Sequence, residues 1–169
     1  DTQTDCGSLI NADVDSGINY NHSDLDGNMW NGSGCVDENG VSISGGCPNH
    51  GWDYISNDND PMDEDGHGTH VTGILGAEGD NGSGIAGMCW DAQIMAIRSL
   101  GPEGGTTADV VNGLDFAVAN GAKIVNMSLG GTSYSSIFNS ALRDARDAGV
   151  LVVVAAGNAG QDLDAIGNS

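Results

Sequence analysis

The sequence contains very little positive charge. Only 4 of its 169 residues are Lys or Arg, against 24 Asp or Glu, which gives a formal net charge of -20. A chain so poor in cations cannot present the basic surface that nucleic acids bind, and an anionic membrane surface repels it. We therefore expect neither nucleic acid nor a membrane among its partners.

Long apolar runs and zinc-type cysteine spacings are also missing. No stretch approaches the roughly 20 apolar residues that a membrane span needs, and no signal peptide is visible. The four cysteines include no Cys-x-x-Cys pair, which argues against a zinc finger. Disulfides are the better interpretation, and they imply an oxidising compartment. We therefore expect a secreted, extracellular protein.

The positions of the cysteines suggest one pairing among the three that four cysteines allow. Cys35 and Cys47 bracket a loop rich in Gly, Asn and Ser, so a bond between them would close a short loop. Cys6 and Cys89 each lie just before an expected strand, and two neighbouring parallel strands could bring them together. This pairing is a hypothesis, because the spacing does not exclude the other two.

Hydrophobic periodicity predicts strands that alternate with helices. Strands are expected at 8–14, 52–55, 93–98, 123–127 and 150–156, and helices at 67–76, 107–120 and 135–148. The segment 150–156 is a nearly continuous apolar run, which is typical of a strand buried on both faces. The order predicts an α/β fold in one domain, with a parallel β-sheet and helices on both faces.

Four motifs follow one another along the chain. They are Val14-Asp15-Ser16-Gly17, the run Gly66-His67-Gly68-Thr69-His70 with its neighbours up to Gly73, Met127-Ser128-Leu129-Gly130-Gly131, and Ala155-Ala156-Gly157-Asn158. This ordered set resembles the subtilisin-like serine proteases, the subtilase family, and covers nearly the whole chain. The resemblance implies a subtilisin-like fold and the hydrolysis of peptide bonds by a serine nucleophile.

The same resemblance implies a role for each polar residue of these motifs. A serine hydroxyl becomes a nucleophile when an imidazole takes its proton and a carboxylate orients that imidazole. Those roles fall to His67 and Asp15, while the amide of Asn158 would stabilise the oxyanion. His70 is expected to be a packed, hydrogen-bonded structural residue. A metallohydrolase site built from Asp15, His67 and His70 is the alternative.

The expected substrate is a polypeptide that adds a strand to exposed backbone of the protein. By resemblance it pairs with two glycine-containing segments and reaches the motif after the last strand. The residues implied are Gly104, Gly105, Ser128, Leu129, Gly130, Ala156 and Gly157.

Calcium is the expected cofactor, as one or two ions, because short carboxylates and carbonyl oxygens in tight loops suit a hard cation. By resemblance the first site comprises Asp24, Asn81, Ser83 and Ile85. The second comprises Asp53, Asp58, Asp60 and Met62, to which Asp63 or Asp65 could contribute. A solvated acidic surface is the alternative interpretation of these residues.

The sequence departs from the family pattern in two respects. The serine motif Gly-Thr-Ser-Met-Ala has no match, and Ser169 lacks its context. We therefore expect residues 1–169 to be the N-terminal portion of one peptidase domain, inactive alone, with the C-terminal remainder and a pro-region as its expected partners. A catalytically inactive peptide-binding module is the alternative. Secondly, Asn11 and Asp13 share a strand face with Asp15, so they need partners or a less buried strand.

Overall fold

A computed structural model describes residues 5–131, 134–158 and 160, so Ser169 lies outside the described residues. Within that part of the chain, five strands form a parallel sheet in the order β2-β3-β1-β4-β5. They are β1 (Asp5–Asp15), β2 (Gly51–Asp53), β3 (Asp91–Arg98), β4 (Ile124–Met127) and β5 (Leu151–Val154). The α-helices are α1 (His67–Gly76), α2 (Thr107–Ala119) and α3 (Ser136–Asp147).

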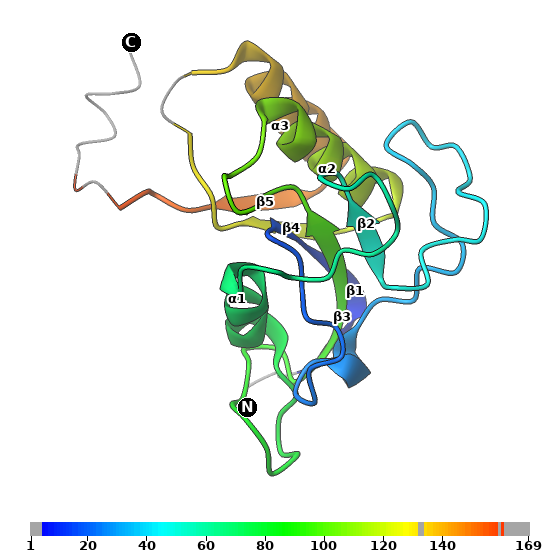
Figure 1. Cartoon of the computed structure of the whole chain (residues 1–169), viewed down its shortest axis with the longest axis vertical. Helices are drawn as coiled ribbons and strands as arrows, with labels where there is room; N and C mark the ends of the chain where they lie inside the picture. The colour runs from blue at the N-terminus through cyan, green and yellow to red at the C-terminus, as the bar shows by residue number, and fades with distance from the viewer. Residues whose placement is uncertain (1–4, 132–133, 159, 161–169) are drawn as a thin grey trace.

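The helices lie on both faces of the sheet, as the alternation of elements predicted. Figure 1 shows α2 and α3 side by side on one face and α1 on the other. A 3-10 turn at Asp26–Asn28 follows β1. No helix in the described ranges has the length and apolar content needed to cross a bilayer.

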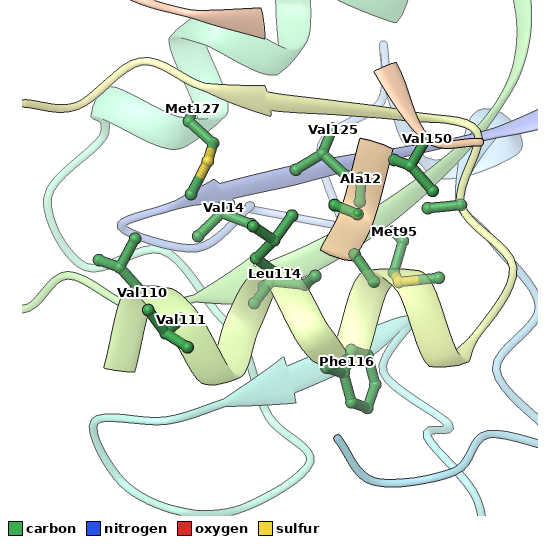
Figure 2. Close-up of a cluster of buried hydrophobic side chains, with 14 of the residues drawn as sticks. Ala12, Val14, Met95, Val110, Val111, Leu114, Phe116, Val125, Met127 and Val150 are labelled. Carbon is green, nitrogen blue, oxygen red and sulfur yellow. The ribbon is translucent and has the colours of Figure 1, made fainter. Parts of the chain in front are cut away.

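The two faces of β1 differ in chemistry because successive side chains of a strand point in opposite directions. Ala12 and Val14 belong to the apolar core with Leu114 of α2 (Figure 2). On the other face Asn11, Asp13 and Asp15 are also buried, with at most 2% of their surface exposed. The sheet therefore has an apolar face under α2 and a polar patch on the side of α1.

Local signals in the sequence fix the ends of the two covering helices. Thr106 caps α2, and its hydroxyl and the carboxylate of Asp109 form a reciprocal capping box. Ser135 caps α3 by accepting a hydrogen bond from the backbone N–H of Phe138. Gly121, which follows α2, has a φ of 83°, a conformation that favours glycine. The helices expected at 107–120 and 135–148 are confirmed to within two residues.

Two disulfides pair the cysteines as their positions suggested. Cys6 in β1 bonds to Cys89, just before the neighbouring strand β3, across a sequence separation of 83 residues. Cys35 bonds to Cys47 across 12 residues. No free cysteine is found in the part of the chain that the structure describes.

Within the described residues, the last strand is not buried on both faces as its apolar run predicted. Leu151 of β5 is 60% exposed and Val153 is 47% exposed. The reason is position, because β5 forms the edge of the sheet and pairs with β4 on one side only. Apolar composition predicted a buried strand, but within the described residues nothing covers much of it.

Candidate active site

The central feature of the candidate site is a hydrogen bond between Asp15 and His67. Asp15 is the last residue of β1, and His67 is the first residue of α1. Nδ1 of His67 lies 2.7 Å from Oδ1 of Asp15. The carboxylate is fully buried, whereas 48% of the His67 side chain is exposed. The structure thus brings together the two residues for which the sequence predicted an orienting carboxylate and a base.

The start of α1 lies very close to the end of β1. The backbone N–H of Gly68 donates to Oγ of Ser16 at 2.9 Å, and the N–H of Ser16 donates to Oδ1 of Asp15 at 2.7 Å. A Cβ atom on Gly68 would lie 2.2 Å from the carbonyl oxygen of Gly17. Glycine at position 68 is therefore needed for the approach that places His67 against Asp15.

Asp63 holds the loop that precedes α1. Its Oδ1 accepts hydrogen bonds from the N–H groups of Asp65 and Gly66, both at 2.9 Å. Its Oδ2 accepts from the N–H and the hydroxyl of Thr69. The pKa of Asp63 is lowered because these hydrogen bonds outweigh the opposing effect of its burial. The carboxylate considered as a calcium ligand thus serves the N-terminus of the helix.

The electrostatics of the pair favour a charged imidazole. The hydrogen bond to Asp15 raises the pKa of His67, with burial opposing and the charge of Asp15 adding to the effect. Because Nδ1 is bonded to the carboxylate, Nε2 is the nitrogen left to accept a proton. A buried carboxylate that fixes the tautomer of an imidazole is the arrangement with which hydrolases activate a nucleophile.

Asn158 lies at the end of the sheet where the strands have their carboxyl termini, as Asp15 and His67 do. The carboxyl ends of parallel strands meet at one edge, and Asn158 follows the end of β5 by four residues. Ala156, Gly157 and Asn158 are exposed. The role of Asn158 as oxyanion donor stays a prediction.

A cleft of about 660 Å³ lies between the two segments expected to bind substrate. Gly104, Gly105, Leu129 and Gly130 line it. Ser128 is not among its lining residues, and its Oγ accepts a hydrogen bond from Asn126 Nδ2 at 3.1 Å. Sequence reasoning missed the apolar wall of the cleft, which includes Leu100, Val110, Tyr134, Phe138 and Leu142. The four-residue spacing of Phe138 and Leu142 is the signal that could have indicated it.

The two glycines of the first segment are held in different ways: Gly104 by hydrogen bonds of its backbone, and Gly105 by close packing. The N–H and C=O of Gly104 both bond to Gly101 within a turn, at 2.9 and 3.0 Å. Gly104 has a φ of 89°, which the turn requires. Gly105 is packed so closely that a Cβ there would lie 2.0 Å from the carbonyl oxygen of Ser99.

The residues expected at the first calcium site lie together. Asp24 is 3% exposed, and its carboxylate accepts from Asn81 Nδ2 at 2.8 Å and from the N–H of Ile85 at 2.9 Å. These hydrogen bonds lower the pKa of Asp24. Asn81, Ser83 and Ile85 also line a hollow of about 270 Å³. The partners of the carboxylate are thus N–H groups, and Oδ1 of Asn81 accepts from the N–H of Ser83 at 3.0 Å, so this loop would have to turn its oxygens toward a hard cation to hold it.

The residues expected at the second site are engaged differently. Oδ2 of Asp53 lies 2.8 Å from Nη1 of Arg98, whose other Nη nitrogen bonds to Glu64. Oδ1 of Asp53 accepts from the N–H groups of Ile55 and Ser56. The charge of Asp53 is therefore already balanced, and a calcium ion would compete with a guanidinium.

Two other carboxylates of that second set, those of Asp58 and Asp60, already accept hydrogen bonds. Oδ1 of Asp58 accepts from the N–H of Asp60, and Oδ1 of Asp60 accepts from the hydroxyl of Tyr20. Met62 is half-buried. These residues fit a calcium site less well than the residues around Asp24 do.

The expectation of a packed, hydrogen-bonded His70 is wrong for the described part of the chain. His70 is exposed, and its side chain has no hydrogen bond there. It lies on the outer side of α1, three residues after His67. No group of three or more His, Cys, Asp or Glu side chains that could hold a metal occurs among the described residues.

Comparison with known proteins identifies the family. The model of the subtilase family matches residues 12–169, and the chain belongs to that family of subtilisin-like serine proteases. Thermitase of Thermoactinomyces vulgaris is 40% identical over 150 residues, which cover 88% of this chain and 47% of thermitase. The minor extracellular protease Epr of Bacillus subtilis (strain 168) is 43% identical over 129 residues, covering 76% of this chain and 19% of Epr.

A solved structure confirms the fold. A cold adapted subtilisin-like serine proteinase superimposes with a TM-score of 0.75 at 30% sequence identity, covering 96% of this chain and 51% of that one. The parallel sheet with helices on both faces is thus the subtilisin-like α/β fold. The chain spans about half the length of thermitase and of the solved proteinase, so it covers only part of the catalytic domain.

Proposed function

We propose that this chain is the N-terminal part of a secreted serine endopeptidase that uses an Asp-His-Ser triad. The observation that carries the proposal is the 2.7 Å hydrogen bond between Asp15 and Nδ1 of His67, in a chain of the subtilase family. Two disulfides and similarity to a protease described as extracellular support secretion. The relatives are serine proteases, which supports peptide-bond hydrolysis as the reaction.

In the proposed mechanism, His67 acts first as a base and then as an acid. Its Nε2 takes the hydroxyl proton as the serine oxygen attacks the carbonyl carbon of the substrate, and Asp15 stabilises the imidazolium. The amide of Asn158 donates to the oxyanion of the tetrahedral intermediate. The imidazolium then gives its proton to the leaving amine, which leaves an acyl-enzyme. Water, deprotonated by His67, then attacks the acyl carbon; the ester bond to the serine oxygen breaks, the imidazolium returns the proton to that oxygen, and the carboxylic acid product leaves.

The proposed substrate is an extended polypeptide in the cleft between the segments at 104–105 and 128–130. Leu129 and Gly130 line one side of the cleft and Gly105 the other. Because the backbone groups of Gly104 already bond to Gly101, Gly105 is the better candidate for main-chain pairing. The apolar wall favours an apolar side chain of the substrate. Ala156 and Gly157 complete the site at the end of β5.

The serine belongs to a C-terminal remainder of the domain, so this chain is inactive alone. The length of the relatives supports such a remainder, since this chain spans 47% of thermitase. The exposed apolar residues of the edge strand β5, Leu151 and Val153, support it as well. A further strand that pairs with β5 would remove an open sheet edge and shield part of these side chains.

We also propose one calcium ion, bound around Asp24. Asn81 and the carbonyl oxygens of Ser83 and Ile85 would be its other ligands in this chain. The ion supplies charge neutralisation and stability, and no chemical step requires it. The ion pair between Asp53 and Arg98 argues against a second ion there.

Labelling with a serine-directed phosphonate tests the proposed activity. In the full-length protease we expect one labelled serine, located after residue 169, and no labelling once His67 is replaced. His67→Ala should abolish labelling, whereas His70→Ala, on the same helix but exposed, should retain it. Labelling that persists in His67→Ala would contradict the proposal.

An inactive peptide-binding module is the second candidate, favoured by the cleft between the segments at 104–105 and 128–130. In that case no phosphonate labelling occurs, but extended peptides still bind. Peptide binding that is measurable by calorimetry and is weakened by Leu129→Asp would identify this function.

A further inference from the structure

Asp13 is a buried carboxyl that the proposed mechanism does not use. It lies two residues before Asp15 on β1, so both side chains point to the same face of the strand. Only 1% of its surface is exposed, and none of the ion pairs in the described ranges includes it. A buried charge without a cationic partner is costly, so its place beside the catalytic pair requires an explanation.

The hydrogen bonds of Asp13 connect three elements of the site. Its Oδ2 accepts from the hydroxyl of Thr72 at 3.1 Å, and Thr72 belongs to α1, the helix that begins with His67. Its Oδ1 accepts from Nδ2 of Asn126 in β4 at 2.8 Å. The same amide lies 3.1 Å from Oγ of Ser128, which begins the substrate segment. Asp13 therefore joins the strand of Asp15, the helix of His67 and the strand that leads to the cleft.

The charged groups that face Asp13 are the two members of the catalytic pair. Asp15 is on its own strand, His67 is on α1, and β4 presents only the uncharged Asn126. Burial raises the pKa of Asp13 to about 7, with the charge of Asp15 adding to the effect and the Asn126 hydrogen bond opposing it. The carboxylate of Asp13 in turn raises the pKa of His67. The two titrations are therefore linked.

We propose that Asp13 is a positioning residue for the catalytic histidine, a second buried carboxyl whose charge state sets how readily His67 is protonated. The inference rests on the proposed function, because His67 must be neutral to act as the base. When Asp13 is ionised, the imidazolium is stabilised and His67 is the stronger base. When Asp13 is protonated, that support is withdrawn and Asp15 alone holds the charge of the imidazolium.

The test is the pH dependence of kcat/KM in the full-length protease and in its Asp13→Asn variant. Asparagine has the shape of aspartate but carries no charge: its Oδ1 can still accept from Asn126, while its Nδ2 donates to the Thr72 hydroxyl, so that hydrogen bond reverses direction. Because the acid limb of kcat/KM reports the free-enzyme histidine, we expect its midpoint to move to lower pH by about 0.5 units or more. A purely structural role would lower the rate at every pH and leave the midpoint in place. Asp65→Asn, which removes an exposed charge near His67, should move it less.

A second readout requires no turnover. NMR titration of the His67 ring should show the same downward shift in Asp13→Asn. An active wild type in which neither midpoint moves on substitution would overturn the inference and leave the proposed function intact. An inactive wild type whose His67 midpoint still moves would overturn the function and support the coupling.

If the variant does not fold, the wild-type protein still decides the matter. Carbon-13 NMR of the Asp13 carboxyl should then show a midpoint near neutral pH, with a matching inflection in the His67 ring signals. A carboxyl that titrates in the ordinary acidic range, without an inflection in His67, would overturn the inference.

Discussion

At the scale of single residues, the Asp15 carboxylate supplies a fixed negative charge to a histidine that is half exposed. Asp15→Asn removes the charge and lets the ring adopt the wrong tautomer. We expect kcat of the full-length protease to fall by about 10⁴-fold, a loss typical of such a change in triad proteases. Steady-state kinetics on a peptide substrate measure it. Asp65→Asn is the matched control and should remain within a few-fold of wild type, while a loss below tenfold in Asp15→Asn would contradict the assignment.

Replacing two glycines of α1 by alanine should change the free energy of unfolding in opposite directions. A Cβ on Gly68 would lie 2.2 Å from the carbonyl oxygen of Gly17, so Gly68→Ala should cost about 1–3 kcal/mol of unfolding free energy and displace His67. A Cβ on Gly73 meets only Ile85, at 3.8 Å. Gly73→Ala should therefore gain up to about 1 kcal/mol from its better helix propensity. Urea unfolding of the inhibited protein measures the change in unfolding free energy for each variant. Equal changes in the two variants would show that the contact at Gly68 is not close.

The functional residues could be predicted from the sequence more readily than the residues to which they hydrogen-bond. The motifs indicated Asp15 and His67 because a short pattern surrounds each of them. The patterning also showed that Asn11 and Asp13 share the face of Asp15, but not what satisfies them. The partners of Asp13 are 59 residues away at Thr72 and 113 residues away at Asn126. Only the folded sheet brings these groups together.

At the scale of elements, the loop before α1 depends on the carboxylate of Asp63. Asp63→Ala removes the acceptor for the N–H groups of Asp65, Gly66 and Thr69, and should cost about 0.5–2 kcal/mol at pH 7, as for other lost helix caps. Since the folded pKa of Asp63 is lowered, its contribution is present above the unfolded pKa of about 4 and is lost as the pH falls through the folded value.

Urea titrations of wild type and Asp63→Ala at several pH values measure this dependence. The difference in unfolding free energy should be largest near pH 7 and should shrink below about pH 4. Asp60→Ala, a change of the same kind in the same acidic segment, serves as the control. A difference that stays constant down to pH 2 would exclude the carboxylate as its source.

The ends of the helices could be predicted from local signals in the sequence. The burial of each element could not. Capping residues such as Thr106 and Ser135 mark the helix starts in the sequence itself. The apolar run of β5 indicated a buried strand, but the strand lies at the edge of the sheet. The cleft likewise combines the loop at Gly105 with Phe138 of α3. Such placement depends on neighbours that are distant in sequence.

At the scale of the whole molecule, the net charge of -20 makes bound cations the natural stabilisers. Removing calcium with a chelator should lower the melting temperature of the inhibited full-length protease, because an ion bound only by the folded state stabilises it. Scanning calorimetry with and without added calcium measures the difference. Asp24→Asn should abolish the response.

Asp91→Asn is the matched control for this experiment, because it removes one exposed charge at the start of β3 from a residue that does not line the hollow around Asn81. It should keep the calcium response. A melting temperature that does not depend on calcium in wild type would contradict the proposed ion. A calcium response that is lost equally in both variants would show that calcium acts by general charge screening and not at a specific site.

The disulfide between Cys6 and Cys89 has a consequence for molecules that have been damaged by proteolysis. It encloses β2, α1, the loop around Asn81 and the shorter disulfide loop. A single cut anywhere between the two cysteines therefore leaves both pieces covalently joined. Nicked molecules would migrate at full size on a gel run without reductant and separate into fragments only after reduction. This crosslink therefore keeps Asp15 and His67 in one covalent unit after a cut in a loop between the two cysteines.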